Sequence, residues 1–184
     1  MLMMAQPIYD CFKKVENEIG IKPHVIYMSP CGKTLNQERV KELSRMENIT
    51  ILCGRYEGVD QRVIDEIVDE EISIGDYVVT GGEIPAMILA DAVSRMLPGV
   101  LSEPEGFMGE SHYSSLLEYP QYTKPPVWHG VEVPEVLTSG HHANIKKWQR
   151  ERAIERTFER RPELLENAEL DKRERAFLEQ LKSK

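Results

Sequence analysis

Three short loops contain the residue types from which a ligand pocket could be built. Their sequences are Ser-Pro-Cys-Gly-Lys-Thr at residues 29–34, Gly-Arg-Tyr-Glu-Gly at 54–58 and Thr-Gly-Gly-Glu-Ile-Pro at 80–85. Glycine lets a ligand approach the backbone closely, so such loops can hydrogen-bond the edge of an adenine and a ribose. The need for a tight turn explains any one loop more simply, but three together favour a shared pocket.

Two phosphate-binding motifs do not fit the sequence. Gly32, Lys33 and Thr34 match the end of a P-loop, but that motif needs a glycine five residues before Gly32, where this chain has Tyr27. The dinucleotide pattern G-x-G-x-x-G is also missing from the sequence. A nucleotide-hydrolysing enzyme that uses Lys33 is therefore disfavoured.

Strand and helix patterns alternate along the first hundred residues. Short apolar runs rich in β-branched residues predict strands at 25–28, 49–53 and 77–80. Helical spacing of apolar residues predicts helices at 7–19, 35–46, 60–68 and 85–96. This alternation predicts an α/β domain with a parallel sheet and helices on both faces, whose loops meet at the carboxyl ends of the strands.

Local signals mark the ends of these helices. Gly20 is placed to end the first helix, and Thr34 with Gln37 has the spacing of a capping box. Asp60 is a candidate N-cap. Pro85 is expected to open an almost wholly apolar helix, which we expect to be packed inside the molecule.

Composition indicates a soluble globular protein. The chain of 184 residues is 41% hydrophobic and 29% charged, and no apolar run approaches the roughly 20 residues that span a bilayer. The N-terminus does not resemble a signal peptide, so we expect a cytoplasmic protein. Cys11, Cys31 and Cys53 are expected to be reduced thiols, and the pair His141 and His142 lacks the spacing of a metal site.

The pattern changes near residue 101, which predicts three parts: a catalytic domain at 1–101, a mobile linker or lid at 102–117 and a helical domain at 118–184. The stretch 101–126 is rich in Gly, Ser, Pro and Glu, and from residue 144 the chain is charged and helical. Residues 1–140 carry 11 basic against 22 acidic residues, whereas residues 141–184 carry 12 against 9. A basic C-terminal end on an acidic body permits a polyanion contact there.

Three longer motifs contain the loops, namely Tyr-Met-Ser-Pro-Cys-Gly-Lys at 27–33, Gly-Arg-Tyr-Glu-Gly-Val-Asp at 54–60 and Ile-Gly-Asp-Tyr-Val-Val-Thr-Gly-Gly-Glu at 74–83. They closely resemble motifs of the bacterial tRNA (guanine-N1-)-methyltransferases of the SPOUT superfamily. The likeness continues through Pro-Gln-Tyr-Thr-Lys-Pro at 120–125, Ser-Gly-His-His at 139–142 and Arg-Arg-Pro-Glu-Leu-Leu at 160–165. It covers essentially the whole chain.

This resemblance implies a SPOUT-type sheet with a trefoil knot, a homodimer with active sites at the interface, and methylation of N1 of the guanosine on the 3′ side of the tRNA anticodon. The methyl donor would be S-adenosyl-L-methionine, and the RNA partner the tRNA anticodon stem-loop. The residues that the resemblance assigns to the cofactor are Tyr27, Met28, Ser29, Pro30, Gly54, Tyr56, Glu57, Ile74, Gly75, Asp76, Tyr77, Val78, Val79, Gly81, Gly82 and Pro85.

Members of the family begin several dozen residues earlier, with a first strand, a helix and a glycine-rich turn. We therefore expect the catalytic domain to lack the family's first strand. The alternative hypothesis is a non-catalytic remnant that binds the cofactor or RNA.

Two residues are assigned catalytic roles by the resemblance. Glu110 holds the position of the family's aspartate base, on a side chain one methylene longer, and would take the N1 proton of guanine. Arg95 would stabilise negative charge on guanine O6. The simpler alternatives are a solvated carboxylate for Glu110 and, for Arg95, a cation at a helix C-terminus.

The basic tail is the candidate RNA contact. Lys146, Lys147 and Arg150 are expected to bind tRNA phosphates, and Trp148 either anchors the helix or stacks near the RNA. The alternative is a solvated helix whose basic residues pair with neighbouring glutamates.

Overall fold

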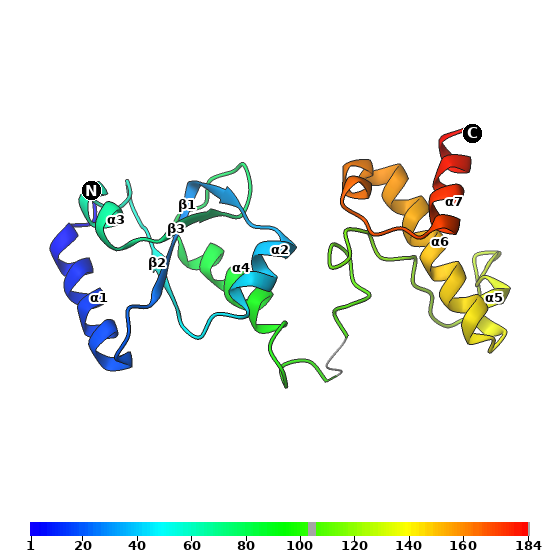
Figure 1. Cartoon of the computed structure of the whole chain (residues 1–184), viewed down its shortest axis with the longest axis horizontal. Coiled ribbons are helices and arrows are strands. Elements are labelled where there is room, and N and C mark those ends of the chain that lie inside the picture. The colour runs from blue at the N-terminus through cyan, green and yellow to red at the C-terminus, as the bar shows by residue number, and fades with distance from the viewer. Residues whose placement is uncertain (103–105, 184) are drawn as a thin grey trace. The chain divides into compact units, whose positions relative to one another are not determined.

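The computed structural model describes residues 1–102 and 106–183 (Figure 1). The chain divides into two compact units, Met1–Pro104 and Glu105–Lys184, and each is described by itself. The part of the expected linker at residues 103–105 lies outside the described residues.

The N-terminal unit is built on a parallel sheet. Within the described residues this sheet has three strands, β1 (His24–Thr34), β2 (Ile49–Cys53) and β3 (Glu70–Ser73), in the order β2-β1-β3. Ile26 in the central strand β1 lies opposite Ile51 on one side and Glu70 on the other. The prediction of an α/β domain with a parallel sheet is confirmed.

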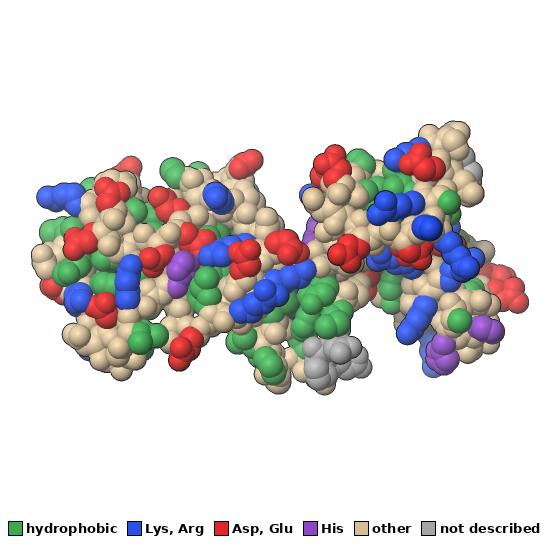
Figure 2. All heavy atoms as spheres, viewed as in Figure 1, with side chains coloured by type: hydrophobic (Ala, Val, Ile, Leu, Met, Phe, Trp, Pro, Cys, Tyr) green, Lys and Arg blue, Asp and Glu red, His purple; other side chains and the backbone are tan. Residues whose placement is uncertain are grey.

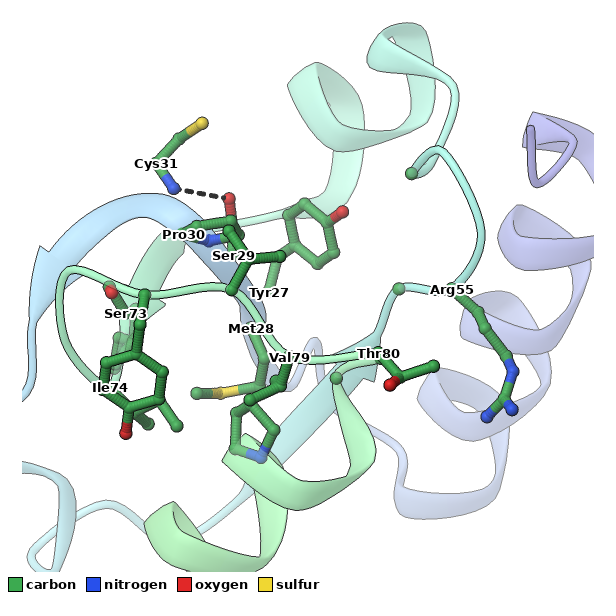
Figure 3. A pocket seen from close by; sticks show the side chains of 18 of the residues that line it. Tyr27, Met28, Ser29, Pro30, Cys31, Arg55, Ser73, Ile74, Val79 and Thr80 are labelled. Atoms are coloured by element: carbon green, nitrogen blue, oxygen red, sulfur yellow. Dashed lines mark hydrogen bonds between the residues drawn. The ribbon is translucent and has the colours of Figure 1, made fainter. Parts of the chain in front are cut away.

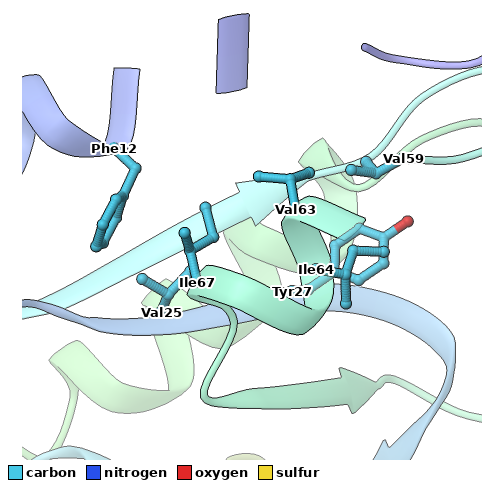
Figure 4. Packing of buried hydrophobic residues seen from close by; sticks show 7 residues of the cluster. All are labelled: Phe12, Val25, Tyr27, Val59, Val63, Ile64 and Ile67. Atoms are coloured by element: carbon cyan, nitrogen blue, oxygen red, sulfur yellow. The ribbon is translucent and has the colours of Figure 1, made fainter. Parts of the chain in front are cut away.

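Two apolar cores cover the two faces of the sheet, because successive side chains of β1 point in opposite directions. Val25 and Tyr27 pack with helices α1 (Ala5–Ile19) and α3 (Gln61–Ile67), as Figure 4 shows. Ile26 and Met28 pack on the other face with α2 (Gln37–Leu43) and α4 (Glu83–Ser94). Helices therefore lie on both faces, as predicted.

The prediction of a strand at 77–80 is wrong, and the third strand of the sheet is β3. Tyr77 and Val78 are exposed and belong to an irregular loop. The third strand is formed by Glu-Glu-Ile-Ser, an acidic sequence that lacks the usual preference for strands. It is stable here because Ile72 is buried beneath α4, while Glu70 is paired with Arg39 and His24.

The first expected loop also differs from the prediction. Residues 29–34 continue β1, and the pairing with β3 shifts by a bulge between Met28 and Lys33. Gly32 is required there, since a Cβ atom would lie 2.4 Å from the backbone carbonyl of Glu71. Thr34 consequently ends a strand and does not cap a helix.

Helix ends were predicted with mixed success. Asn36 caps α2, accepting from the backbone N–H of Arg39 at 2.9 Å, so the proposed capping box of Thr34 with Gln37 is wrong. Asp60 caps α3 as predicted, and Gly20 ends α1 in the left-handed conformation.

The prediction that the apolar helix at 85–96 is packed inside is wrong for the chain described here. Helix α4 begins at Glu83, two residues before Pro85, and buries Leu89 against the sheet. Its opposite side is exposed, with Met87 70% accessible and Ile84 and Ile88 also accessible to solvent. An apolar helix face is therefore uncovered in the single chain.

The C-terminal unit is mainly helical. It contains a short hairpin of β4 (Val127–Trp128) and β5 (Val131–Glu132), then α5 (Glu135–Thr138), α6 (His142–Arg160), the 3₁₀ helix η1 (Pro162–Glu166) and α7 (Lys172–Lys182). Its core joins Ile154 of α6 and Leu178 of α7 to Leu116. Leu116 falls in the stretch expected to be a mobile linker, so the end of that stretch is packed on the helical unit.

A charged cluster lies where β1 and β3 begin. Arg39 Nε donates to Glu70 Oε2 at 3.0 Å, and Val25 N donates to Asp69 Oδ2 at 2.8 Å. Burial opposes ionisation of Glu70, but hydrogen bonds from Arg39 and His24 outweigh it and hold its pKa below the ordinary 4.5. Burial acts the same way on Asp69, whose pKa is nevertheless lowered from 3.8 by the N–H of Val25 and by Lys22.

We expect this cluster to make the N-terminal unit sensitive to acid. Both carboxyl groups are more acidic in the folded than in the unfolded chain, so their stabilisation is complete above the unfolded pKa values of 4.5 and 3.8. It is lost as the pH falls through the lower folded values. The midpoint of thermal unfolding should fall as the pH is lowered from about 6 to about 2.5. In Glu70→Gln the midpoint should depend less on pH. Equal pH dependence in parent and variant would contradict this assignment.

Candidate functional site

A cavity of about 280 Å³ lies at the carboxyl ends of the strands in the N-terminal unit (Figure 3). Its walls come from the three segments singled out in the sequence: the end of β1, the loop after β2 and the loop between β3 and α4. Such an edge is where parallel α/β sheets bind ligands. The cavity is lined by Tyr27, Met28, Ser29, Pro30, Cys31, Gly54, Arg55, Tyr56, Glu57, Gly58, Ile72, Ser73, Ile74, Tyr77, Val78, Val79, Thr80, Gly81, Gly82 and Pro85.

Most residues assigned to the cofactor meet at this cavity. Among the described residues, Gly75 and Asp76 are the assigned positions that do not line it. Gly75 instead helps to fix the loop after β3. Ser73 Oγ donates to the Gly75 carbonyl at 2.9 Å and accepts from the Gly75 N–H at 3.1 Å. Its φ of 144° is a conformation that favours glycine.

Sequence reasoning missed several lining residues, namely Cys31, Arg55, Gly58, Ile72, Ser73 and Thr80. Cys31 and Arg55 belong to the loops singled out in the sequence, so the positions of those loops could have identified them. Ile72 and Ser73 could not be found in this way, because β3 itself was not predicted.

Close packing of backbones shapes the cavity. Gly82 N donates to Gly54 O at 2.8 Å, which joins the loop after β2 to the start of α4. A Cβ atom on Gly82 would lie 2.8 Å from the Cα atom of Cys53, and one on Gly54 would lie 2.7 Å from the hydroxyl of Tyr27. Glycine is therefore required at both positions by space.

Apolar and polar groups are both present on the walls. Burial is the main cause that raises the pKa of Tyr27, with the Glu71 carboxylate adding to it, so the phenol stays neutral. Met28, Ile74 and Val79 supply apolar surface, while Ser29 Oγ accepts from Cys31 N at 3.2 Å. A mostly apolar hollow walled by glycine-containing loops, with Arg55 and Glu57 at its edge, can take a flat heterocycle with a ribose.

The two assigned catalytic residues belong to different units. Arg95 follows the end of α4 and lines a hollow of about 580 Å³ with Met87, Asp91 and other α4 residues. Glu110 belongs to the C-terminal unit, where it lines a hollow of about 190 Å³ together with Lys146 and Arg150. The sequence had not linked Glu110 to these two cations.

Some basic residues of α6 form hydrogen bonds or ion pairs within the chain. Arg150 Nε donates to Glu174 Oε1 of α7 at 2.7 Å, and its Nη2 donates to the carbonyl of Glu169 at 2.7 Å. Lys147 lies 3.7 Å from Glu151. On the face of the C-terminal unit seen in Figure 2, basic side chains lie among acidic ones.

Comparison with known sequences identifies the class of protein. The family described as tRNA (Guanine-1)-methyltransferase TrmD matches residues 1–167, so this chain belongs to that family.

Individual relatives carry a consistent name. A tRNA (guanine-N(1)-)-methyltransferase of Ruminiclostridium cellulolyticum is 58% identical over 164 residues, which is 89% of this chain and 70% of that protein. The protein of the same name from Alkaliphilus oremlandii is 56% identical over 189 residues, covering 100% of this chain and 76% of the relative. The corresponding Bacillus licheniformis protein is 45% identical over 184 residues, covering 100% and 76%.

Among the helices of the described residues, none combines the length and the apolar character needed to cross a membrane.

Proposed function

We propose that this protein transfers a methyl group from S-adenosyl-L-methionine to N1 of the guanosine on the 3′ side of the tRNA anticodon. The observation that carries the proposal is the cavity at the carboxyl edge of the sheet, built from the three loops of a chain in this family. The relatives named as tRNA (guanine-N(1)-)-methyltransferases support the same activity. They do not favour a non-catalytic remnant.

The residues present fit this cofactor. Gly54 and Gly82 let the loop after β2 pack closely on the start of α4. The cavity beside them is lined by the apolar side chains of Met28 and Ile74. S-adenosyl-L-methionine supplies a methyl group on a positively charged sulfur. The protein's part is to bind and orient the donor, to exclude water and to remove a proton from the guanine.

Glu110 and Arg95 are proposed to act on the guanine during methyl transfer. The N1 atom of guanine carries a proton at neutral pH, so a base must take it for N1 to accept a methyl group. We assign that role to Glu110. Arg95 would stabilise the negative charge that develops on O6. No covalent bond to the protein is required.

The active assembly is proposed to be a homodimer. Its support is the uncovered apolar face of α4, where Ile84, Met87 and Ile88 are exposed in the single chain beside Arg95. A second copy placed on this face would bury apolar surface and enclose Arg95.

The finer features of the fold and setting are proposed on family membership. A trefoil knot is consistent with the way the segment before α4 packs against the loop after β2, through the bond from Gly82 to Gly54. We also propose a cytoplasmic location, where the tRNA substrate would be found. The division at 1–101, 102–117 and 118–184 remains our proposal for catalytic domain, lid and RNA-binding domain.

Cofactor binding tests the proposed site. Titration of the full chain with S-adenosyl-L-methionine and with its demethylated product should give saturable heat, because the cavity is walled by glycine-containing loops and apolar side chains. No heat at about millimolar ligand, from protein shown to be folded by its thermal transition, would contradict the proposed site.

A second experiment concerns RNA binding by α6. We propose that Lys146, Lys147 and Arg150 contact tRNA phosphates. Lys146→Ala with Lys147→Ala should weaken tRNA binding and reduce the slope of log affinity against log salt by about 1.5, since each neutralised phosphate contributes about 0.7–0.9. Cofactor affinity should not change.

Controls separate RNA contact from structure in that experiment. The adjacent pair Lys13 and Lys14 on α1, changed together to Ala, should keep the parent's salt slope. Arg150→Ala needs a thermal unfolding measurement as well, because Arg150 also joins α6 to α7 through Glu174. A parental salt slope in the double variant of Lys146 and Lys147 would show that neither touches phosphate.

A further inference from the structure

An ion pair connects two of the three cavity loops. Arg55 Nη1 lies 2.7 Å from Glu83 Oε1, although the two residues are 28 positions apart. Arg55 belongs to the loop after β2 and lines the cavity, while Glu83 is the first residue of α4. Figure 3 shows the Arg55 side chain extending from the loop after β2.

Backbone contacts show that these loops meet at this point. Arg55 and Gly81 form an isolated antiparallel bridge, and Gly82 N donates to Gly54 O at 2.8 Å. The Glu83 carboxylate folds back over Gly81, so closely that a Cβ atom there would lie 2.3 Å from Oε2. The bond from Gly82 to Gly54 is part of that bridge, so the side-chain pair is a second link beside one backbone link.

Glu83 is held in its charged form. Its own backbone N–H and then Arg55 lower the pKa of this carboxyl group. It also lies in the first turn of α4, where the helix dipole favours negative charge. The carboxylate is therefore a fixed anchor for the guanidinium.

The loop that carries Arg55 needs such an anchor. The next residue, Tyr56, has a φ of 62°, a left-handed conformation that costs energy for a residue other than glycine. Tyr56 lines the cavity but its side chain is 63% exposed, so burial does little to hold it. Contacts of its neighbours must hold the backbone in place.

We propose that Arg55 and Glu83 are positioning residues that clasp residues 54–58 to the start of α4 and so hold both loops in the conformation that binds the methyl donor. This inference rests on the proposed function. The side chains are about half exposed, 51% and 52%, and an exposed pair adds little to global stability. Its effect falls on the local geometry of the cavity.

The test is calorimetry of the full chain with S-adenosyl-L-methionine and its demethylated product. Arg55→Gln and Glu83→Gln should each weaken affinity by about two- to fivefold, the range expected for an exposed pair. The double variant should bind no more weakly than the single variant with the lower affinity, because each substitution removes the same ion pair. Arg55→Lys should retain affinity within about twofold, since it keeps the charge.

Arg62→Gln is the matched control. Arg62 pairs with Asp60 at 2.7 Å, but neither residue lines the cavity. This control should bind like the parent, and the unfolding midpoint of each ligand-free variant should stay within about 4 °C of the parent's.

The inference and the proposed function can fail separately. If the parent binds and Arg55→Gln binds equally well, the clasp is overturned while the proposed function stands. Additive losses in the double variant, or an equal loss in Arg62→Gln, would also overturn it. If the folded parent binds neither compound, the proposed function fails and the clasp fails with it.

Discussion

Replacing Glu110 by Gln is expected to lower the rate of guanosine N1 methylation by about 10²–10⁴-fold, the usual contribution of a general base. The amide keeps the shape of the side chain but cannot take the N1 proton. Affinity for S-adenosyl-L-methionine should change by less than about threefold, because Glu110 belongs to the C-terminal unit and does not line the cofactor cavity. Single-turnover rates with a labelled methyl donor measure this effect.

Glu118→Gln is the matched control for Glu110. Glu118 belongs to the same C-terminal unit, and its carboxylate accepts from Gln121 at 2.6 Å. The same chemical change there should leave the single-turnover rate within about threefold of the parent. A near-parental rate in Glu110→Gln would remove this residue from the reaction.

Gly82→Ala is expected to weaken binding of the methyl donor by about 10- to 100-fold. The added methyl group would lie 2.8 Å from Cys53 Cα and 2.9 Å from Gly54 N, both of them backbone atoms that cannot rotate away. Overpacking of this kind costs about 1–3 kcal/mol, and a tenfold change in affinity corresponds to about 1.4 kcal/mol. The methyl group would also push apart the bond from Gly82 to Gly54. Calorimetry and thermal unfolding should both report the change.

Gly109→Ala separates a lack of space from a general effect of replacing glycine. A Cβ atom at Gly109 would meet no heavy atom within 4 Å. This variant should keep the parent's cofactor affinity and unfolding midpoint. Unchanged cofactor affinity in Gly82→Ala would mean that the loops can separate without affecting the site, against the geometry described above.

Local signals in the sequence predicted the parts of the fold that depend on neighbouring residues. The alternation of side chains in β1, the cap at Asp60 and the end of α1 at Gly20 each follow from short-range geometry. The strand β3 could not be found, because Glu70 and Glu71 do not favour a strand, and Glu70 is stabilised there by Arg39, which is distant in the sequence. Residues 77–80 were wrongly predicted to form a strand. They lie in a loop, and their side chains line the cavity.

The site was predicted unevenly for the same reason. The glycine-containing loops marked most of the cavity, and the family resemblance supplied Glu110 and Arg95. Residues brought together only by packing could not be inferred, such as Glu110 and Lys146, which line one hollow, or Arg55 and Glu83, which form an ion pair. Nor could the apolar sequence of α4 indicate that one of its faces is uncovered in the single chain.

The central claim concerns the product of the reaction. The purified chain of 184 residues should be incubated with S-adenosyl-L-methionine and a tRNA transcript that has guanosine on the 3′ side of the anticodon, and the digested RNA analysed by mass spectrometry. We expect 1-methylguanosine at that position, and none when the guanosine is replaced by adenosine. A methyl group on another atom or nucleotide, or no methylation by protein that binds both substrates, would contradict it.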